Sequence, residues 1–140
     1  MPILALDVGS KRIGVAVGDP TGTFAMPLAT IERRNVRDDL ERIVALAQEY
    51  SATELVVGDP LTLGGERGPA AEKMDAFVER LRGAYAGTVH RVDERLTTAQ
   101  ATKTLLAADV SRAKRKSAVD AMAAALILDT FLARRRRGAV

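Results

Sequence analysis

The chain has 140 residues, 47% of them hydrophobic, and a formal net charge of +3; this length predicts one hydrophobic core and a single domain over residues 1–140. It contains no cysteine and one histidine, which excludes disulfide frameworks and metal sites built from thiolates or several imidazoles. No segment is as long and apolar as a signal peptide or a membrane span requires, so we expect a cytoplasmic protein without membrane contact.

Two apolar runs at the N-terminus are joined by a short polar turn and predict an antiparallel pair of strands. Residues 3–6 are apolar on both faces, as in a buried central strand, and Asp7 follows them. A carboxylate there needs a cation, a metal ion or turn N–H groups as its partner, which makes Asp7 a candidate site residue. On the return strand Gly14, Ala16 and Gly18 leave one face bare, so a helix, another backbone or a ligand can approach closely.

The next segments are expected to complete a three-stranded meander and to add a helix. Asp19 to Gly22 has turn chemistry, so residues 24–31 should return as the third antiparallel strand. Asn35 is a good N-cap, and the helical spacing of the apolar residues behind it predicts a helix that ends near Tyr50.

A strand, a helix and a second strand follow, and this order predicts that the two strands are parallel. We expect the strands over residues 54–58 and 88–92, with a helix that begins at Pro69 between them. Asp59 follows the first of these strands, and we interpret it as a turn residue before Pro60 rather than a metal ligand.

Asp93 and Glu94 stand at the carboxyl end of the fifth strand, before a helix expected over residues 97–108. The position makes both acids candidates for a functional site. Their alternative role is a surface ion pair with Arg91 or Arg95, which is worth under about 1 kcal/mol.

The last helix is expected to begin at Ser117, after a basic connector, and its apolar residues on nearly every side indicate burial. Asp120 and Asp129 lie on it nine residues apart, about half a turn out of phase, so only one can face the sheet, and we expect Asp120. Ser117 and Asp120 also match a capping box, in which Asp120 would only stabilise the helix start. The arginines from residue 134 onward are expected to form a solvated basic tail.

Three acids, Asp7, Glu94 and Asp120, are our candidate catalytic and metal-binding residues. In an open sheet with parallel strands, ligands bind outside the carboxyl ends of the strands, so acids placed there can converge. Carboxylates without His or Cys suit hard cations, here Mg²⁺ or Mn²⁺. Two such ions about 3.5–4 Å apart can orient an attacking water and stabilise the leaving oxygen of a phosphodiester. The constellation therefore favours a metal-dependent nuclease.

Positive charge is concentrated beside the candidate acids, which favours a polyanionic partner. The residues expected to bind nucleic-acid phosphates are Lys11, Arg12, Arg95, Arg112, Lys114, Arg115 and Lys116. Aromatic residues are few and lie mostly in apolar stripes, so we expect recognition of backbone and shape rather than base stacking on a platform. Whether the protein forms a homodimer is left open.

Four phrases of the sequence resemble, in order and spacing, the YqgF/RuvX family of RNase H-like proteins. They are LALDVGSKRIGVAVGD, LVVGDPL with GGERGPAA, VDERLTTAQA and KSAVDAMAAALIL, and the resemblance runs from Ile3 to about Leu132. Members of that family are described as Holliday-junction resolvases and as nucleases that mature the small-subunit rRNA precursor. The resemblance implies an α/β RNase H-like fold, with a mixed five-stranded sheet flanked by helices, and metal-dependent cleavage of pre-16S rRNA or branched DNA.

By the same resemblance, Asp7 matches the acid of the family's first strand, Glu94 the acid of its DER motif, and Asp120 the acid of its last helix. Asp59 departs from the pattern, because the family usually has an apolar residue there in its GLPL phrase. Whether Asp59 or Asp93 replaces or assists Glu94 as a ligand is therefore open.

Two other classes of protein remain as alternatives. One is a nucleic-acid-binding module that has lost catalysis. The other is a domain related to actin-like ATPases, whose phosphate-binding hairpin resembles residues 7–11. Length disfavours the second, because those enzymes need two such domains with a nucleotide between them.

Overall fold

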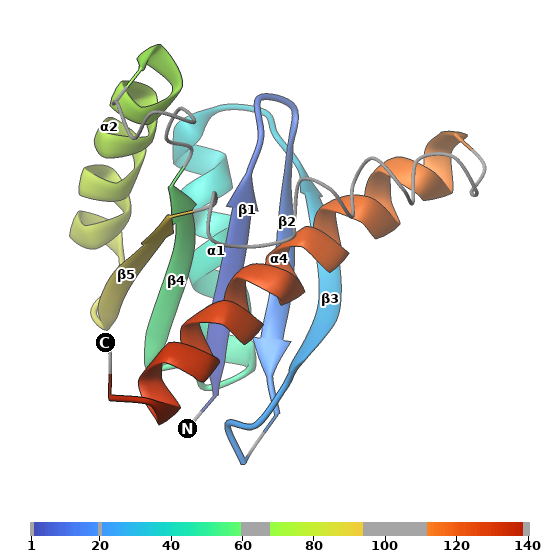
Figure 1. Cartoon of the computed structure of the whole chain (residues 1–140). Coiled ribbons are helices and arrows are strands. Elements are labelled where there is room, and N and C mark those ends of the chain that lie inside the picture. Colours follow the sequence, from blue (N-terminus) through green and yellow to red (C-terminus); the bar gives the residue numbers. More distant parts are fainter. Residues whose placement is uncertain (1, 20, 60–67, 94–111, 139–140) are drawn as a thin grey trace.

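The computed structural model describes residues 2–19, 21–59, 68–93 and 112–138, which include a five-stranded sheet with helices on both faces (Figure 1). The strands are β1 (Ile3–Val8), β2 (Arg12–Gly18), β3 (Ala25–Glu32), β4 (Glu54–Asp59) and β5 (Thr88–Asp93). The helices are α1 (Val36–Glu49), α2 (Pro69–Ala84) and α4 (Arg112–Arg136). None of these helices is long and apolar enough to cross a membrane.

The strand order is β3-β2-β1-β4-β5. The β1–β2 and β2–β3 pairs are antiparallel, and the β1–β4 and β4–β5 pairs are parallel. The predicted meander and the predicted parallel pair are both confirmed. The helix expected over residues 97–108 lies outside the described residues.

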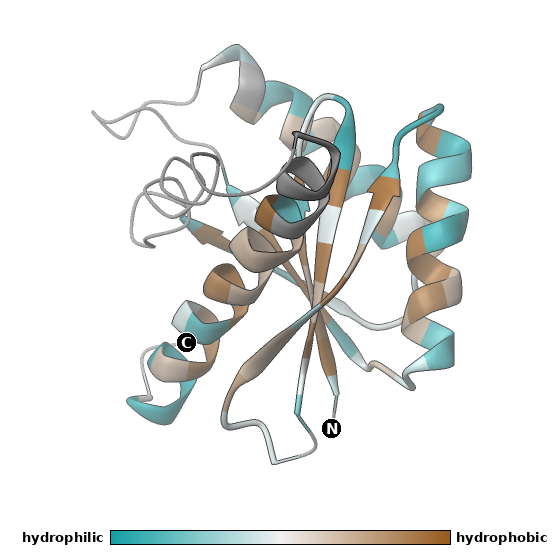
Figure 2. Cartoon of the chain, turned by 90° about the vertical axis from the view of Figure 1, so that its right-hand side faces the viewer, coloured by the Kyte–Doolittle hydropathy of each residue, from teal (hydrophilic) through white to brown (hydrophobic). Residues whose placement is uncertain are grey.

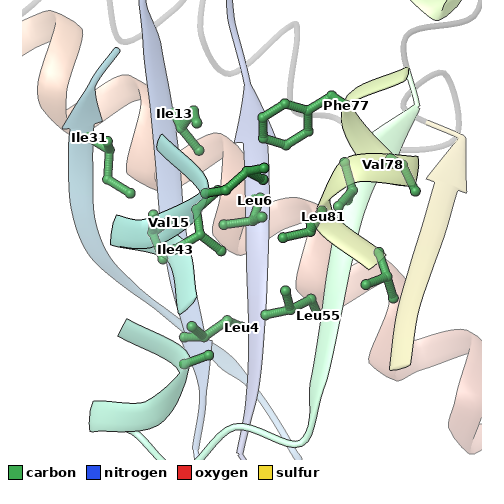
Figure 3. Close-up of a cluster of buried hydrophobic side chains, with 14 of the residues drawn as sticks. Leu4, Leu6, Ile13, Val15, Ile31, Ile43, Leu55, Phe77, Val78 and Leu81 are labelled. Carbon is green, nitrogen blue, oxygen red and sulfur yellow. The ribbon is translucent and has the colours of Figure 1, made fainter. Parts of the chain in front are cut away.

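The sheet separates two hydrophobic cores, one on each face, rather than the single core that the chain length predicts. Alternate residues of β1 point to opposite faces, so Leu4 and Leu6 pack under α1 and α2, while Ile3 and Ala5 pack under α4. Figure 2 shows α1 and α4 on opposite sides of the sheet, and Figure 3 shows the core on the α1 and α2 side. Burial on both faces explains why residues 3–6 of β1 form a continuous apolar run.

Helix α1 begins as the sequence predicts. The Asn35 side chain accepts a hydrogen bond from the Asp38 backbone N–H at 2.9 Å, and the helix ends at Glu49, one residue before the expected Tyr50. The buried Asp39 carboxylate in the first turn accepts from Arg33 Nε at 2.9 Å, so the helix start is tied to the segment that precedes it.

Helix α4 starts at Arg112, so the expected start at Ser117 is wrong. Residues 112–116 are arginine, alanine and lysine, which are strong helix formers, and no Gly or Pro interrupts them. Asp120 therefore lies more than two turns inside the helix, where the orphan N–H groups of a helix start are absent. The capping role considered for Asp120 is excluded.

The arginines that end α4 are not all part of a solvated tail. Arg135 forms a bidentate pair with Glu54 of β4, at 2.6 and 2.9 Å, and its guanidinium lies 4.6 Å from the Phe131 ring centroid. His90 Nε2 of β5 is 2.9 Å from a Glu54 oxygen, and Arg136 donates to the Thr23 carbonyl at 3.0 Å. Helix α4 is thus fastened to the sheet at its C-terminal end.

Replacing Glu54 by Gln is expected to flatten the acid side of the stability curve. The Arg135 guanidinium, followed by the His90 ring, holds the pKa of Glu54 at about 2, against an ordinary value of 4.5. With a lowered folded-state pKa, the stabilisation is present above pH 4.5 and is lost as the pH falls through about 2. Since Glu54 is 21% and Arg135 40% exposed, we expect about 1 kcal/mol or less.

Urea unfolding of the wild type and of Glu54→Gln at several pH values between about 2 and 5 measures this effect. Glu49→Gln, at an exposed position near the end of α1, is the control for a general loss of one acid. Parallel stability curves for wild type and Glu54→Gln would show that the Arg135 pair contributes nothing.

Candidate active site

Helix α4 packs directly against the face of β2 that carries Gly14, Ala16 and Gly18. A Cβ atom at Gly14 would lie 1.9 Å from the backbone carbonyl oxygen of Asp120 and 2.9 Å from the Ala121 nitrogen, so only glycine allows this approach. Farther along the same face, a Cβ at Gly18 would meet Leu128 Cδ2 at an ordinary 3.7 Å. The expectation that a helix or another backbone approaches this face is confirmed.

Asp7 is brought to the same place by strand pairing. It is directly opposite Gly14 in the antiparallel β1–β2 register, and opposed residues project from the same face of a sheet with Cβ positions about 4.5–5.5 Å apart. The empty side-chain position of Gly14 is filled by the Asp120 backbone. Asp7 and Asp120, far apart in the sequence, therefore lie near each other on the α4 face.

The two acids differ in exposure and surroundings. Asp7 is 5% exposed, in a central strand whose position is set by neighbours on both sides. Asp120 is less buried, with 19% of its side chain exposed, and its carboxylate accepts from Arg12 Nε at 2.9 Å. One acid is thus fixed by the sheet, and the other is fixed by the helix seat and an arginine.

Arg12 has a role that the sequence reasoning did not assign. We expected it to bind phosphates, but its side chain, 22% exposed, is paired with Asp120. A sequence signal was available, because Arg12 precedes Gly14 by two residues and so shares the face of β2 on which α4 lies. The neighbouring Lys11 is exposed in the β1–β2 turn.

Asp59 lies on the opposite face of the sheet from Asp7. The parallel register pairs Leu6 with Val57, and both are in the core under α1 and α2, so Asp59, two residues beyond Val57, points to that side too. It is the last residue of β4 rather than part of a turn, and it accepts from Arg91 Nη2 at 2.9 Å.

The same Arg91 reaches helix α2, where its Nη1 donates to Asp75 at 2.7 Å. Asp93 is paired with Asp59 in the β4–β5 register, so it shares the face of Asp59. These placements separate Asp59 and Asp93 from the Asp7 and Asp120 pair, and they associate Asp59 with a contact between β5 and α2.

Several expected site residues cannot be placed. Glu94 and Arg95 lie outside the described residues, and so do the side chains of Arg112, Lys114, Arg115 and Lys116. Among the residues that are described, no three acidic or histidine side chains form a metal-binding group. Asp7 and Asp120 nevertheless fit a hard divalent cation in their chemistry, because both offer carboxylate oxygens on one face beside a position that only glycine can fill.

Sequence comparisons match this chain to nucleases and resolvases. A family model described as "RuvX: Holliday junction resolvase" matches residues 1–134. A relative from Moorella thermoacetica, named "Putative pre-16S rRNA nuclease", is 46% identical over 134 residues, which cover 96% of each chain. A relative from Thermoanaerobacter pseudethanolicus with the same name is 45% identical over 133 residues, covering 94% of this chain and 96% of the relative.

Solved structures show the same architecture. T. thermophilus RuvC in complex with a Holliday junction substrate superposes with a TM-score of 0.63 at 12% identity, covering 99% of this chain and 98% of RuvC. The Fowlpox virus resolvase in complex with Holliday junction DNA gives a TM-score of 0.56 at 12% identity, with coverage of 96% and 99%. At such identities the likeness shows the fold, which is the expected RNase H-like one.

Proposed function

Since the chain belongs to the RuvX family, we propose that it is a metal-dependent nuclease that hydrolyses phosphodiester bonds in structured nucleic acid. The substrates we propose are the 5′ region of pre-16S rRNA, branched DNA of the Holliday-junction type, or both. The names of the relatives support the RNA, and the family description supports the junction. The observation that carries the proposal is the seating of α4 on Gly14, which brings Asp120 to Asp7.

We propose that Asp7, Glu94 and Asp120 hold Mg²⁺ or Mn²⁺. When bound, such ions activate a water for in-line attack on phosphorus and stabilise the oxygen that leaves. Asp7 contributes a carboxylate whose place in the fold is fixed, because the central strand that carries it is hydrogen-bonded to strands on both sides. Arg12 compensates the charge of Asp120 in the described structure and stays close enough to contact a substrate phosphate once that pair opens.

The remaining basic residues of the prediction keep their proposed role in phosphate binding. Lys11 is exposed in the turn next to Asp7, a position from which an ammonium group can reach a bound backbone. For Arg95, Arg112, Lys114, Arg115 and Lys116 the support is their position in the sequence, close to Glu94 or Asp120. The cytoplasm is the compartment we propose.

Cleavage of two labelled substrates side by side tests the function. A four-way DNA junction and a transcript that spans the 5′ end of 16S rRNA with its precursor sequence are each incubated with Mn²⁺, Mg²⁺ or EDTA. We expect cleavage of at least one substrate with a divalent ion and none in EDTA. Undiminished cleavage in EDTA would overturn the metal mechanism, and tight binding of both substrates without cleavage would favour the non-catalytic binding module.

A further inference from the structure

A pocket of about 580 Å³ opens on the face of the sheet opposite Asp7. It lies between the β1–β2 turn, the start of α1 and helix α2, and its apolar lining includes Val8, Val36, Met74 and Phe77. Figure 3 shows Phe77 projecting from α2 toward the strands that carry Leu6 and Ile13. The volume is within the range of about 300–1,000 Å³ that is usual for small-molecule sites.

The pocket also has a positive rim. Arg33, Lys73 and Arg80 line it, and none of the described lining residues is acidic. Lys73, Ala76 and Arg80 follow one another at helical spacing, and all three are exposed along one side of α2. Within the described residues, neither the Lys73 side chain nor the Arg80 side chain takes part in a hydrogen bond or an ion pair. The matching ligand therefore has an apolar body and an anionic group.

Arg33 holds the walls of the pocket together. Its Nη1 donates to the Gly9 carbonyl at 2.8 Å, its Nε donates to Asp39 at 2.9 Å, and its guanidinium lies 5.3 Å from the Phe77 ring centroid. One side chain thus connects the β1–β2 turn, α1 and α2, which leaves little of the pocket to be ordered on binding. Because Asp39 compensates the charge of Arg33, the cations that remain among the described lining residues are Lys73 and Arg80.

The pocket and the acid pair share one strand end. Val8, Gly9 and Ser10 line the pocket, whereas Asp7, one residue earlier, faces α4. The two features therefore lie on opposite sides of the β1–β2 turn. A nucleic-acid strand that crosses this turn, past the exposed Lys11, can place one phosphate at Asp7 and a neighbouring nucleotide in the pocket.

We propose that the pocket binds an unpaired nucleotide of the substrate close to the cleaved bond. Its base contacts the apolar lining, and its phosphate is bound by Lys73 and Arg80. This inference rests on the proposed nuclease function and adds to it a preference for a single-stranded extension beside a duplex. Binding of one base in an apolar pocket does not require the platform of exposed aromatic residues that this sequence lacks.

Binding in EDTA tests the pocket without any cleavage. The probes are a blunt RNA duplex and the same duplex with a short single-stranded extension that carries 2-aminopurine. We expect the extension to tighten binding by about tenfold, the lower part of the range for burying one base, and to change the 2-aminopurine fluorescence. The quantity compared among variants is this ratio between the extended and the blunt probe.

Two pocket variants and two matched controls complete the experiment. Ala76→Trp fills the pocket from an exposed helix position, and the double change Lys73→Gln with Arg80→Gln removes the anion-binding groups. Each is expected to lower the ratio below about twofold. Ala84→Trp, exposed on α2 outside this pocket, and Arg137→Gln, exposed beyond the end of α4, should keep the wild-type ratio.

Two results would overturn the inference. One is a wild-type ratio near one, and the other is a tenfold ratio that survives in both pocket variants. A ratio near one together with a free nucleoside monophosphate that binds the wild type but not Ala76→Trp would assign the pocket to a free nucleotide instead. A protein with the expected ratio that cuts neither substrate in Mn²⁺ would instead refute the nuclease function and leave the pocket assigned.

Discussion

Asp7→Asn is expected to lower cleavage on the order of 10³-fold or more while nucleic-acid binding stays close to that of the wild type. The substitution keeps the shape of a side chain that is 5% exposed in a central strand, but it removes the negative charge that a divalent ion needs. Cleavage is measured at saturating Mn²⁺, and binding is measured in EDTA. The separation of the two readouts distinguishes loss of chemistry from loss of substrate.

The matched control is Asp129→Asn on helix α4. Asp129 is exposed and accepts a hydrogen bond from the Ala25 backbone N–H at 3.0 Å, which an Asn carbonyl can also accept. Its cleavage rate should equal that of the wild type. Thermal melts add a second readout, because an ion that binds only the folded state raises its stability, and Asp7→Asn should gain less from Mn²⁺ than the wild type does. An Asp7→Asn protein that still cuts at the wild-type rate would remove Asp7 from the site.

Gly14→Ala is expected to destabilise the protein by about 3 kcal/mol or more and to abolish cleavage with it. The new methyl group would lie 1.9 Å from the Asp120 carbonyl oxygen and 2.2 Å from its carbonyl carbon. These are backbone atoms of a long buried helix, so they cannot turn aside as a flexible side chain can. Helix α4 has to move off the sheet, and Asp120 moves with it.

Gly18→Ala is the control for Gly14→Ala, since it makes the same change on the same face of the same strand. Its methyl group would lie 3.7 Å from Leu128 Cδ2 and from the Ile3 carbonyl oxygen, which is ordinary contact. We expect a stability within about 1 kcal/mol of the wild type, with any change in the stabilising direction. Urea unfolding measures both variants. Equal stabilities for the two would mean that Gly14 is not the seat of α4.

Structural features that depend only on neighbouring residues or on the periodicity of apolar residues can be predicted from the sequence. The all-apolar run before Asp7 indicated a central strand, and Asn35 with the spacing behind it located α1 to within one residue at its end. The strand, helix, strand order in the middle of the chain indicated the parallel pair. The predicted helix start at Ser117 was wrong, because the capping pattern there was given more weight than the strong helix formers that precede it.

Contacts between distant segments were decided only by the tertiary structure. The face of Asp59 depends on the register between β1 and β4, since a shift of one residue would have placed it beside Asp7. Arg135, which the sequence placed in a solvated tail, pairs with Glu54 and so attaches the end of α4 to the sheet. The two residues are 81 positions apart. Arg12 and Asp120 are 108 positions apart, and their ion pair required α4 to cross β2 at Gly14.

The sequence by itself determined the strands, their directions, the seat for a close approach on β2, and Asp7, Glu94 and Asp120 as candidates. Each of these follows from side-chain size, charge and periodicity, which are properties of the residues themselves. Only the tertiary structure decided that Asp7 and Asp120 share a face, that Asp59 does not, and that a cation-rimmed pocket lies behind the β1–β2 turn. Those facts depend on strand register and on how closely a helix can approach a sheet, and both are set by packing over the whole chain.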